Sequence, residues 1–109
     1  DSPNKSGNDK FVSFSKVSFY KSPFKRFVKK QHRPLQLVIE DEVEKVCKNI
    51  EIGELKKGDL SGFRVHKFKF KGQEYLIAYQ VQSSDTIFYM IGSHENFYRD
   101  LKDYIKEAG

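Results

Sequence analysis

The sequence predicts an α+β domain of element order β-α-α-β-β-β-α, in which an antiparallel sheet packs against an N-terminal helical hairpin with a C-terminal helix. Apolar residues recur at three- and four-residue steps over residues 35–50, which indicates a helix. Segments rich in aromatic and β-branched residues follow between residues 63 and 91 and indicate strands. The length of 109 residues is that of one domain. We expect residues 1–10 to be a flexible N-terminal segment and residues 11–109 to form the domain.

The N-terminal half is expected to hold one strand and two helices. Residues 11–20 are rich in Phe, Val and Tyr, which is typical of a strand. Ser22 and Pro23 predict a helix start, with the serine as N-cap and the proline in the first helical position. Pro34 predicts the start of the second helix. Because Cys47 lies on the apolar stripe of that helix, we interpret it as a core residue rather than a nucleophile.

The C-terminal half is expected to hold three strands and one helix. A loop with three glycines, residues 52–62, precedes a strand at residues 63–70. Further strands are predicted at residues 74–81 and 86–91, and the last is apolar on both faces, which is typical of a central strand. Ser93 is expected to cap the C-terminal helix.

Charge is unevenly distributed along the chain. The net charge is +5, but residues 1–39 carry nine Lys/Arg against two Asp/Glu, and residues 55–75 carry six against two. A basic surface of this kind attracts polyanions such as nucleic acid. Lysine-rich faces are equally typical of simple solvation, and charge alone does not separate the two interpretations.

Composition excludes several classes of protein. A single cysteine excludes a disulfide scaffold and a cysteine-based zinc site. The longest apolar run falls far short of the ~20 residues that cross a bilayer, and the first ten residues lack the apolar region of a signal peptide. The three histidines have no metal-binding spacing, and no glycine-rich phosphate loop is present. We therefore expect no metal, no cofactor, no membrane contact and a cytoplasmic location.

Two groups of residues are candidates for chemistry. Lys67, Lys69 and Lys71 alternate along a predicted strand, so they share one face at intervals of roughly 6.6 Å, close to the phosphate spacing of an extended nucleic acid. Such a row also protects an edge strand from aggregation. His94 and Tyr98 are four residues apart at the start of the predicted C-terminal helix. Imidazole and phenol can together serve acid–base chemistry on a phosphodiester, although most pairs at this spacing are structural.

Two long segments carry a resemblance to a known family. They read IGELKKGDLSGFRVHKFKFKGQEYLIAYQV and GSHENFYRDLKDYIK, with an apolar strand between them. Over roughly residues 11–107 the chain resembles the RelE/ParE superfamily of bacterial type II toxins. The resemblance implies an antiparallel sheet packed against a helical hairpin, and a cognate antitoxin that neutralises the toxin. RelE-like members enter the ribosomal A site and cut messenger RNA, whereas ParE-like members inhibit DNA gyrase without cutting.

The GSHENFY ending resembles the RelE/YafQ side of the superfamily, in which a corner histidine and an aromatic residue contribute to cleavage. Carried over to this sequence, the resemblance implies the catalytic residues His94, Tyr98, Arg64 and Lys67. The basic residues expected to bind RNA are Lys69, Lys71, Lys29, Lys30 and Arg33.

One position departs from the family pattern. Many nucleolytic members have an arginine after the aromatic residue of the second long strand, whereas here Leu76 follows Tyr75. If that arginine stabilises the pentavalent phosphorane, its task falls to Arg64 or a lysine, or is lost.

The leading hypothesis is a metal-independent, ribosome-dependent mRNA endonuclease that inhibits translation, with mRNA, ribosomal RNA and an antitoxin as partners. The alternatives are a ParE-like, non-enzymatic inhibitor of DNA gyrase and a catalytically inactive RelE-fold protein that only pairs with an antitoxin.

Overall fold

The computed structural model describes residues 18–82 and 85–108. The elements within them are β2 (Ser18–Tyr20), α2 (Ser22–Lys30), α3 (Arg33–Lys48), β3 (Glu54–Leu55), a short 3-10 helix η1 (Gly58–Leu60), β4 (Arg64–Phe70), β5 (Gln73–Gln82), β6 (Asp85–Ser93) and α4 (Phe97–Ala108). The predicted α+β class is confirmed, and β3 and η1 are added inside the segment expected to be a loop. The flexible segment at residues 1–10 and most of the strand predicted at residues 11–20 lie outside the described residues.

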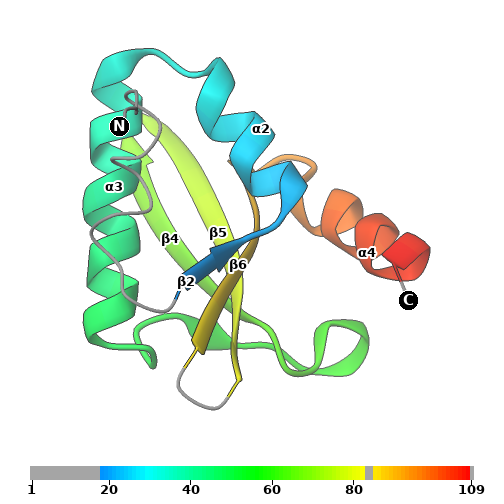
Figure 1. Cartoon of the computed structure of the whole chain (residues 1–109). Coiled ribbons are helices and arrows are strands. Elements are labelled where there is room, and N and C mark those ends of the chain that lie inside the picture. Colours follow the sequence, from blue (N-terminus) through cyan, green and yellow to red (C-terminus); the bar gives the residue numbers. More distant parts are fainter. Residues whose placement is uncertain (1–17, 83–84, 109) are drawn as a thin grey trace, which may run out of the picture.

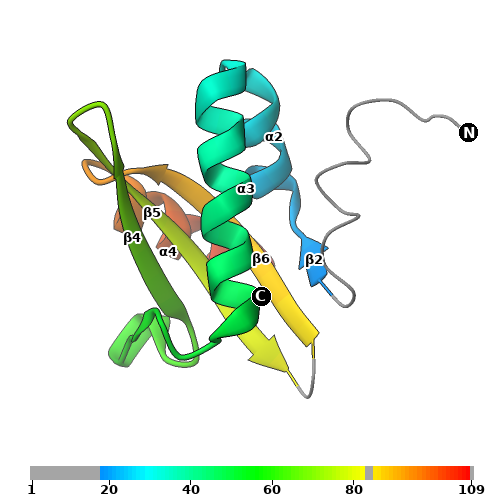
Figure 2. The same cartoon turned by 90° about the vertical axis from the view of Figure 1, so that its left-hand side faces the viewer.

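A five-stranded sheet in the order β2-β6-β5-β4-β3 divides the domain (Figure 1). β4, β5 and β6 are antiparallel neighbours, and β6 lies in the interior of the sheet between β2 and β5, as its two apolar faces predict. In contrast to the expected antiparallel sheet, β2 runs parallel to β6, so the sheet is mixed. Parallel neighbours require a long crossover, which here consists of all the elements between these two strands. Figure 2 shows α2 and α3 on one face of the sheet and α4 behind the other; we call these the α3 face and the α4 face.

The α3 face buries the larger hydrophobic cluster. Phe24 of α2, Tyr79 of β5 and Phe88 of β6 are fully buried, and the ring centroid of Phe88 lies 5.6 Å from that of Phe24 and 5.9 Å from that of Tyr79. α3 contributes the buried residues Leu35, Ile39, Val43 and Val46. The predicted apolar stripe of this helix is therefore confirmed as far as its last turn.

Tyr79 fixes the loop that follows α3. Its hydroxyl donates a hydrogen bond to the carbonyl oxygen of Ile50 at 2.8 Å and accepts one from the N–H of Gly53 at 2.9 Å. A Cβ atom on Gly53 would lie 2.7 Å from that hydroxyl oxygen, so the approach requires glycine. Burial raises the pKa of Tyr79. This loop is thus anchored to the sheet by a core side chain.

The α4 face carries a second hydrophobic cluster. Its buried members are Leu60, Phe63, Val65, Leu76, Ala78, Phe97 and Leu101. α4 supplies Phe97 and Leu101, and Leu76 of β5 is fully buried. The two side chains of β4 next on this face, Lys67 and Lys69, are exposed, so α4 covers only part of it.

Two predicted helix caps are displaced. The N-cap of α2 is Lys21, and Ser22 is the first helical residue, without a side-chain cap hydrogen bond. The prediction of Ser93 as the cap of the last helix is wrong, because β6 continues to Ser93, which pairs with Tyr75 of β5. α4 begins only at Phe97. Strand pairing therefore displaces the helix start by several residues.

Candidate functional site

β4 separates its side chains between the two faces of the sheet. Arg64, His66 and Phe68 point to the α3 face, because His66 contacts α3 and Phe68 belongs to the cluster beneath it. Val65 belongs to the cluster beneath α4, so Lys67 and Lys69 lie on the α4 face by alternation. Of the cations of β4, only the two lysines are on the α4 face.

His94 and Tyr98 meet where β6 connects to α4. The N–H of His94 donates to the carbonyl oxygen of Glu74 at 3.2 Å, so the histidine extends the pairing of β6 with β5 by one step. The prediction that His94 lies within the first helical turns is wrong, because it occupies the turn before Phe97. The two rings nevertheless meet as expected: their centroids are 6.5 Å apart and their planes are perpendicular. His94 is exposed and Tyr98 is half-buried.

Lys67 and Lys69 lie on the same face of the sheet as this corner. In the register of β4 with β5, Lys69 lies opposite Glu74. The carbonyl oxygen of Glu74 accepts the hydrogen bond from the N–H of His94. Neighbouring strands are about 4.8 Å apart, so the backbones of Lys69 and His94 are separated by roughly 10 Å. Exposed lysine side chains can span most of that distance. Lys71, in contrast, has a φ of 51° in the turn after β4 and does not continue the row.

Arg64 is not brought together with His94 and Tyr98. Its Nη1 donates to the carbonyl oxygen of Gly53 at 2.8 Å on the α3 face of the sheet. Leu76, at the position where many nucleolytic relatives have arginine, is fully buried beneath α4. Neither position places a guanidinium beside the His94–Tyr98 corner.

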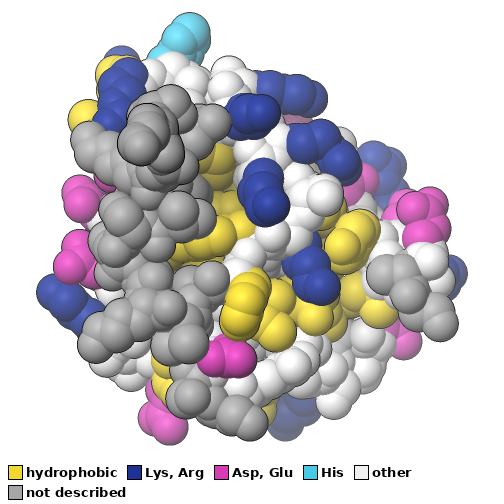
Figure 3. Space-filling view, viewed as in Figure 1, with side chains coloured by type: hydrophobic (Ala, Val, Ile, Leu, Met, Phe, Trp, Pro, Cys, Tyr) yellow, Lys and Arg dark blue, Asp and Glu magenta, His cyan; other side chains and the backbone are white. Residues whose placement is uncertain are grey.

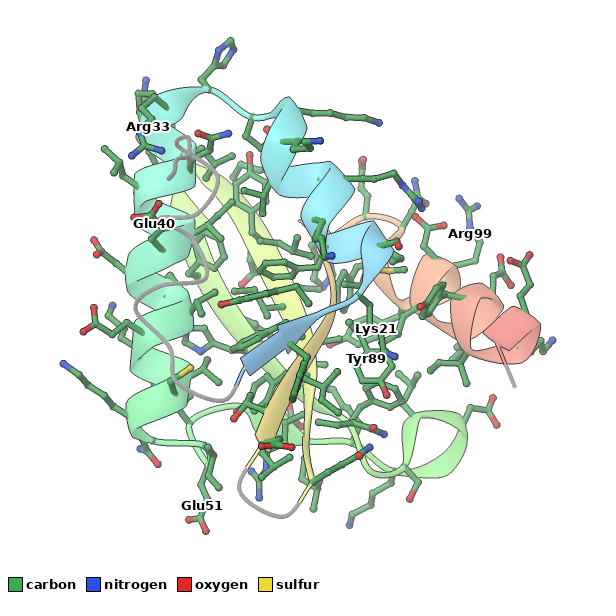
Figure 4. The ribbon with its side chains drawn as sticks, in the orientation of Figure 1. Lys21, Arg33, Glu40, Glu51, Tyr89 and Arg99 are labelled. Atoms are coloured by element: carbon green, nitrogen blue, oxygen red, sulfur yellow. The ribbon has the colours of Figure 1, made fainter. Side chains whose placement is uncertain are left out.

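A second basic region follows α2. Residues 18–39 contain six Lys/Arg and no Asp/Glu, and Figure 3 shows Lys and Arg side chains gathered over this helix. Lys29 and Lys30 form its exposed last turn. Arg33 is the first residue of α3, and its Nη1 lies 3.9 Å from Oε2 of Glu40 (Figure 4). These predicted RNA-binding residues therefore belong to the helical hairpin and not to the α4 face.

Lys56 is not among the residues that the sequence predicts for the site. Its Nζ lies 5.1 Å from the ring centroid of Tyr98 and 3.2 Å from Oε1 of Glu54. Burial opposes the charge of Lys56, but hydrogen bonding to Tyr98 and Glu54 outweighs it and raises the pKa of the ammonium. No sequence signal distinguishes Lys56 from its neighbour Lys57, because only the fold brings Tyr98 to it.

Residues 18–82 and 85–108 contain no group of three or more His, Cys, Asp or Glu residues able to hold a metal ion. Within the described helices, none is both long and apolar enough to cross a membrane.

Comparisons with known proteins agree with this architecture. Two solved structures share the fold. A chain of the intact E. coli RelBE toxin-antitoxin complex has a TM-score of 0.60 and 15% identity, covering 72% of this chain and 96% of that chain. The isolated E. coli RelE toxin has a TM-score of 0.56 and 14% identity, covering 81% of this chain and 97% of that chain. No curated protein sequence matches.

One family model matches residues 19–102, and its description is a ParE-like toxin of type II bacterial toxin-antitoxin systems. The match runs from β2 into α4 and so includes every strand of the sheet. The chain therefore belongs to the family of ParE-like toxins of type II bacterial toxin-antitoxin systems, within the RelE/ParE superfamily.

Proposed function

We propose that this toxin is a metal-independent, ribosome-dependent mRNA endonuclease that inhibits translation. The observation that supports the proposal is the meeting of His94 with Tyr98, at 6.5 Å between ring centroids, on the sheet face that also exposes Lys67 and Lys69. An imidazole, a phenol and two ammonium groups are the types of side chain that transfer protons and offset charge at a phosphodiester.

The proposed reaction is an internal transfer at the RNA phosphate. A general base removes the proton of a 2′-OH, and the resulting oxygen attacks the adjacent phosphorus. The bond from phosphorus to the 5′-oxygen breaks, and a general acid protonates that oxygen, which leaves a 2′,3′-cyclic phosphate and a 5′-OH. His94 is the first candidate for one proton transfer, because imidazole exchanges protons near neutral pH. Tyr98 orients the leaving 5′-oxygen or donates a proton to it.

Positive charge at the phosphate comes from lysine in this proposal. Lys67 and Lys69 stabilise the negative charge that develops on the pentavalent phosphorus. Arg64, which the family resemblance implies as catalytic, is held by the Gly53 carbonyl on the α3 face, so we assign it no contact with the reacting phosphate.

The helical hairpin supplies the binding surface for the ribosome in this proposal. Lys29, Lys30 and Arg33 are exposed cations that contact ribosomal RNA phosphates, and Lys71 adds a cation at the β4–β5 turn. Binding should therefore weaken steeply as salt rises. We further propose a cognate antitoxin as partner, since the E. coli relative was crystallised in a toxin-antitoxin complex. Such a partner would cover the basic surface with acidic and apolar residues.

The test maps mRNA 5′ ends in a purified translation system with wild-type protein and a His94→Ala, Tyr98→Phe double variant. Loss of a general acid or base lowers cleavage by about 10²–10⁴-fold. Tyr104→Phe is the matched control, because Tyr104 is also a half-buried tyrosine of α4 but its ring contacts Tyr89 and not His94; it should cleave normally. Cleavage at A-site codons that persists in the double variant contradicts the assignment.

Inhibition of DNA gyrase is the second candidate function. It is favoured by Leu76, which places a buried apolar side chain where many nucleolytic relatives have arginine. A supercoiling assay separates the candidates: inhibited supercoiling with intact mRNA supports the gyrase function, and cleaved mRNA with normal supercoiling supports the nuclease. A toxin-fold protein that only pairs with an antitoxin changes neither readout.

A further inference from the structure

We propose that Lys56 is a positioning residue that holds the Tyr98 side chain in place for its proton-transfer role. The inference rests on the proposed nuclease function and adds to it a residue from the loop after β3, far from His94 and Tyr98 in the sequence. It is carried by the placement of the Lys56 ammonium beside the Tyr98 ring.

The backbone around Lys56 is firmly anchored. Its N–H donates to the carbonyl oxygen of Phe63 at 2.9 Å, which closes the loop that contains η1. Leu60, at the end of η1, is buried in the same cluster as Phe97 and Leu101 of α4. The loop is thus packed against the helix that carries Tyr98, and the backbone from which the Lys56 side chain extends is held in place.

The exposure of Lys56 separates it from the other lysines. Among the lysines in the described residues, Lys56 alone is not exposed, and its side chain retains 21% of its accessible surface. An ion pair does not require this burial, because Lys48 pairs with Glu44 at 3.3 Å while its side chain stays 75% exposed. Lys56 gives up hydration where the Tyr98 ring is its additional partner, as expected for a cation–π contact.

The Tyr98 ring contacts two groups. The Lys56 ammonium lies 5.1 Å from the Tyr98 ring centroid, and the His94 ring centroid lies 6.5 Å from it. A flexible exposed lysine loses side-chain entropy when it orders, whereas Lys56 is already held by contacts with Glu54 and Tyr98. Preorganised groups of this kind lower a barrier without reorganisation during the reaction.

The experiment compares wild-type protein with Lys56→Met, Lys56→Arg and Lys57→Met. Methionine keeps an unbranched stem and removes the charge, and Lys57 is the adjacent exposed lysine of the same loop. Single-turnover cleavage is measured on programmed ribosomes at saturation, together with ribosome affinity and urea unfolding. We expect Lys56→Met to lower the cleavage rate by about tenfold or more, with affinity nearly unchanged. Lys56→Arg should recover most of the rate, and Lys57→Met should match wild type.

A second readout does not depend on cleavage. The Tyr98 ring resonances in an NMR spectrum should move in Lys56→Met and stay in place in Lys57→Met. Resonances that stay in place in both variants overturn the inference, as does a cleavage rate of Lys56→Met equal to that of Lys57→Met. A wild-type protein that leaves mRNA intact defeats the proposed function instead, and the inferred role for Lys56 in proton transfer with it; the resonances then report only whether Lys56 orders Tyr98.

Discussion

The two faces of β4 use their charged side chains differently. On the α3 face, Arg64 donates to the Gly53 carbonyl at 2.8 Å, and Nε2 of His66 lies 2.7 Å from Oε1 of Glu42 on α3. On the α4 face, Lys67 and Lys69 are exposed. Alternate residues of one basic strand therefore have different surroundings. Arg64 and His66 make contacts within the fold, whereas Lys67 and Lys69 are available to a ligand. Alternation, and not charge count, assigns each cation to its face.

The largest expected effect comes from the aromatic core of the α3 face. Phe88→Ala removes a fully buried ring that lies 5.4 Å from the ring of Tyr20 and 5.6 Å from that of Phe24. The free energy of unfolding should fall by about 3–5 kcal/mol, measured by urea denaturation. Phe19→Ala is the control, since Phe19 is 53% exposed and should change stability by about 0.5 kcal/mol or less. Equal effects of the two variants would contradict the description of this core.

The buried pair between His66 and Glu42 comes next. His66→Ala leaves the buried Glu42 carboxylate without its imidazole partner, although Lys45 still donates to Glu42 Oε2 at 3.0 Å. We expect a loss of about 1–3 kcal/mol. In a double-mutant cycle with Glu42→Leu, the two losses should sum to more than the loss of the double variant, because the partners are in contact. Strict additivity would show that the pair is not coupled.

The hydroxyl of Tyr79 should have a smaller effect. Tyr79→Phe removes the group that bonds Ile50 and Gly53 and leaves the ring in the core. The expected loss is about 1–2 kcal/mol, again by urea denaturation. Tyr75→Phe removes a hydroxyl from the same strand and serves as the comparison; a loss as large as that of Tyr79→Phe would count against the specific role of the loop contact.

The same variant tests a dependence on alkaline pH. Burial raises the pKa of Tyr79 in the folded protein, whereas in the unfolded chain a tyrosine ionises near pH ~10. Above that pH the unfolded state releases a proton that the folded state retains, so stability falls as pH rises. The decline in unfolding free energy between pH 9 and pH 11 should be less steep in Tyr79→Phe than in wild type. Identical slopes would contradict the assignment.

The exposed lysines should have the smallest effect on stability. A Lys67→Ala, Lys69→Ala double variant should change the free energy of unfolding by about 0.5 kcal/mol or less. If both lysines contact phosphates, the plot of log binding constant for single-stranded RNA against log salt concentration should become less steep by about 1.4 in this variant. Arg64→Ala, in contrast, should lower the free energy of unfolding and leave the salt dependence of RNA binding unchanged. A variant of Arg64 that alters the slope breaks the contrast between the faces of β4.

Local sequence signals predicted the elements well. The apolar stripe of α3 and the alternation of β4 are properties of neighbouring residues, and both are confirmed, except that Lys71 lies in the turn after β4. The prediction that Ser93 caps the last helix is wrong, because pairing with Tyr75 of β5 keeps Ser93 in strand β6. His94 and Tyr98 are close, but through a turn rather than through helical spacing.

The sequence does not predict side-chain contacts whose partner is distant along the chain. The hydrogen bond that occupies Arg64 goes to a carbonyl in the loop before β3, which no spacing rule connects to it. The contact of Lys56 with Tyr98 likewise joins the loop after β3 to α4. Residue type and spacing indicate candidates, but the choice between a fold contact and an available side chain depends on tertiary structure.

The parallel pairing of β2 has a consequence for how the toxin is made. Ser18–Tyr20 pairs with the stretch from Thr86 to Phe88, and the N–H of Lys21 donates to the carbonyl oxygen of Phe88 at 2.9 Å. On a translating ribosome, β2 leaves the exit tunnel long before its partner strand is synthesised, and contacts of such sequence separation form slowly. The α3-face core around Phe24 and Phe88 is then incomplete until β6 has emerged. We expect a truncated nascent chain to lack a finished toxin fold, so that toxicity begins only with molecules whose synthesis has passed β6.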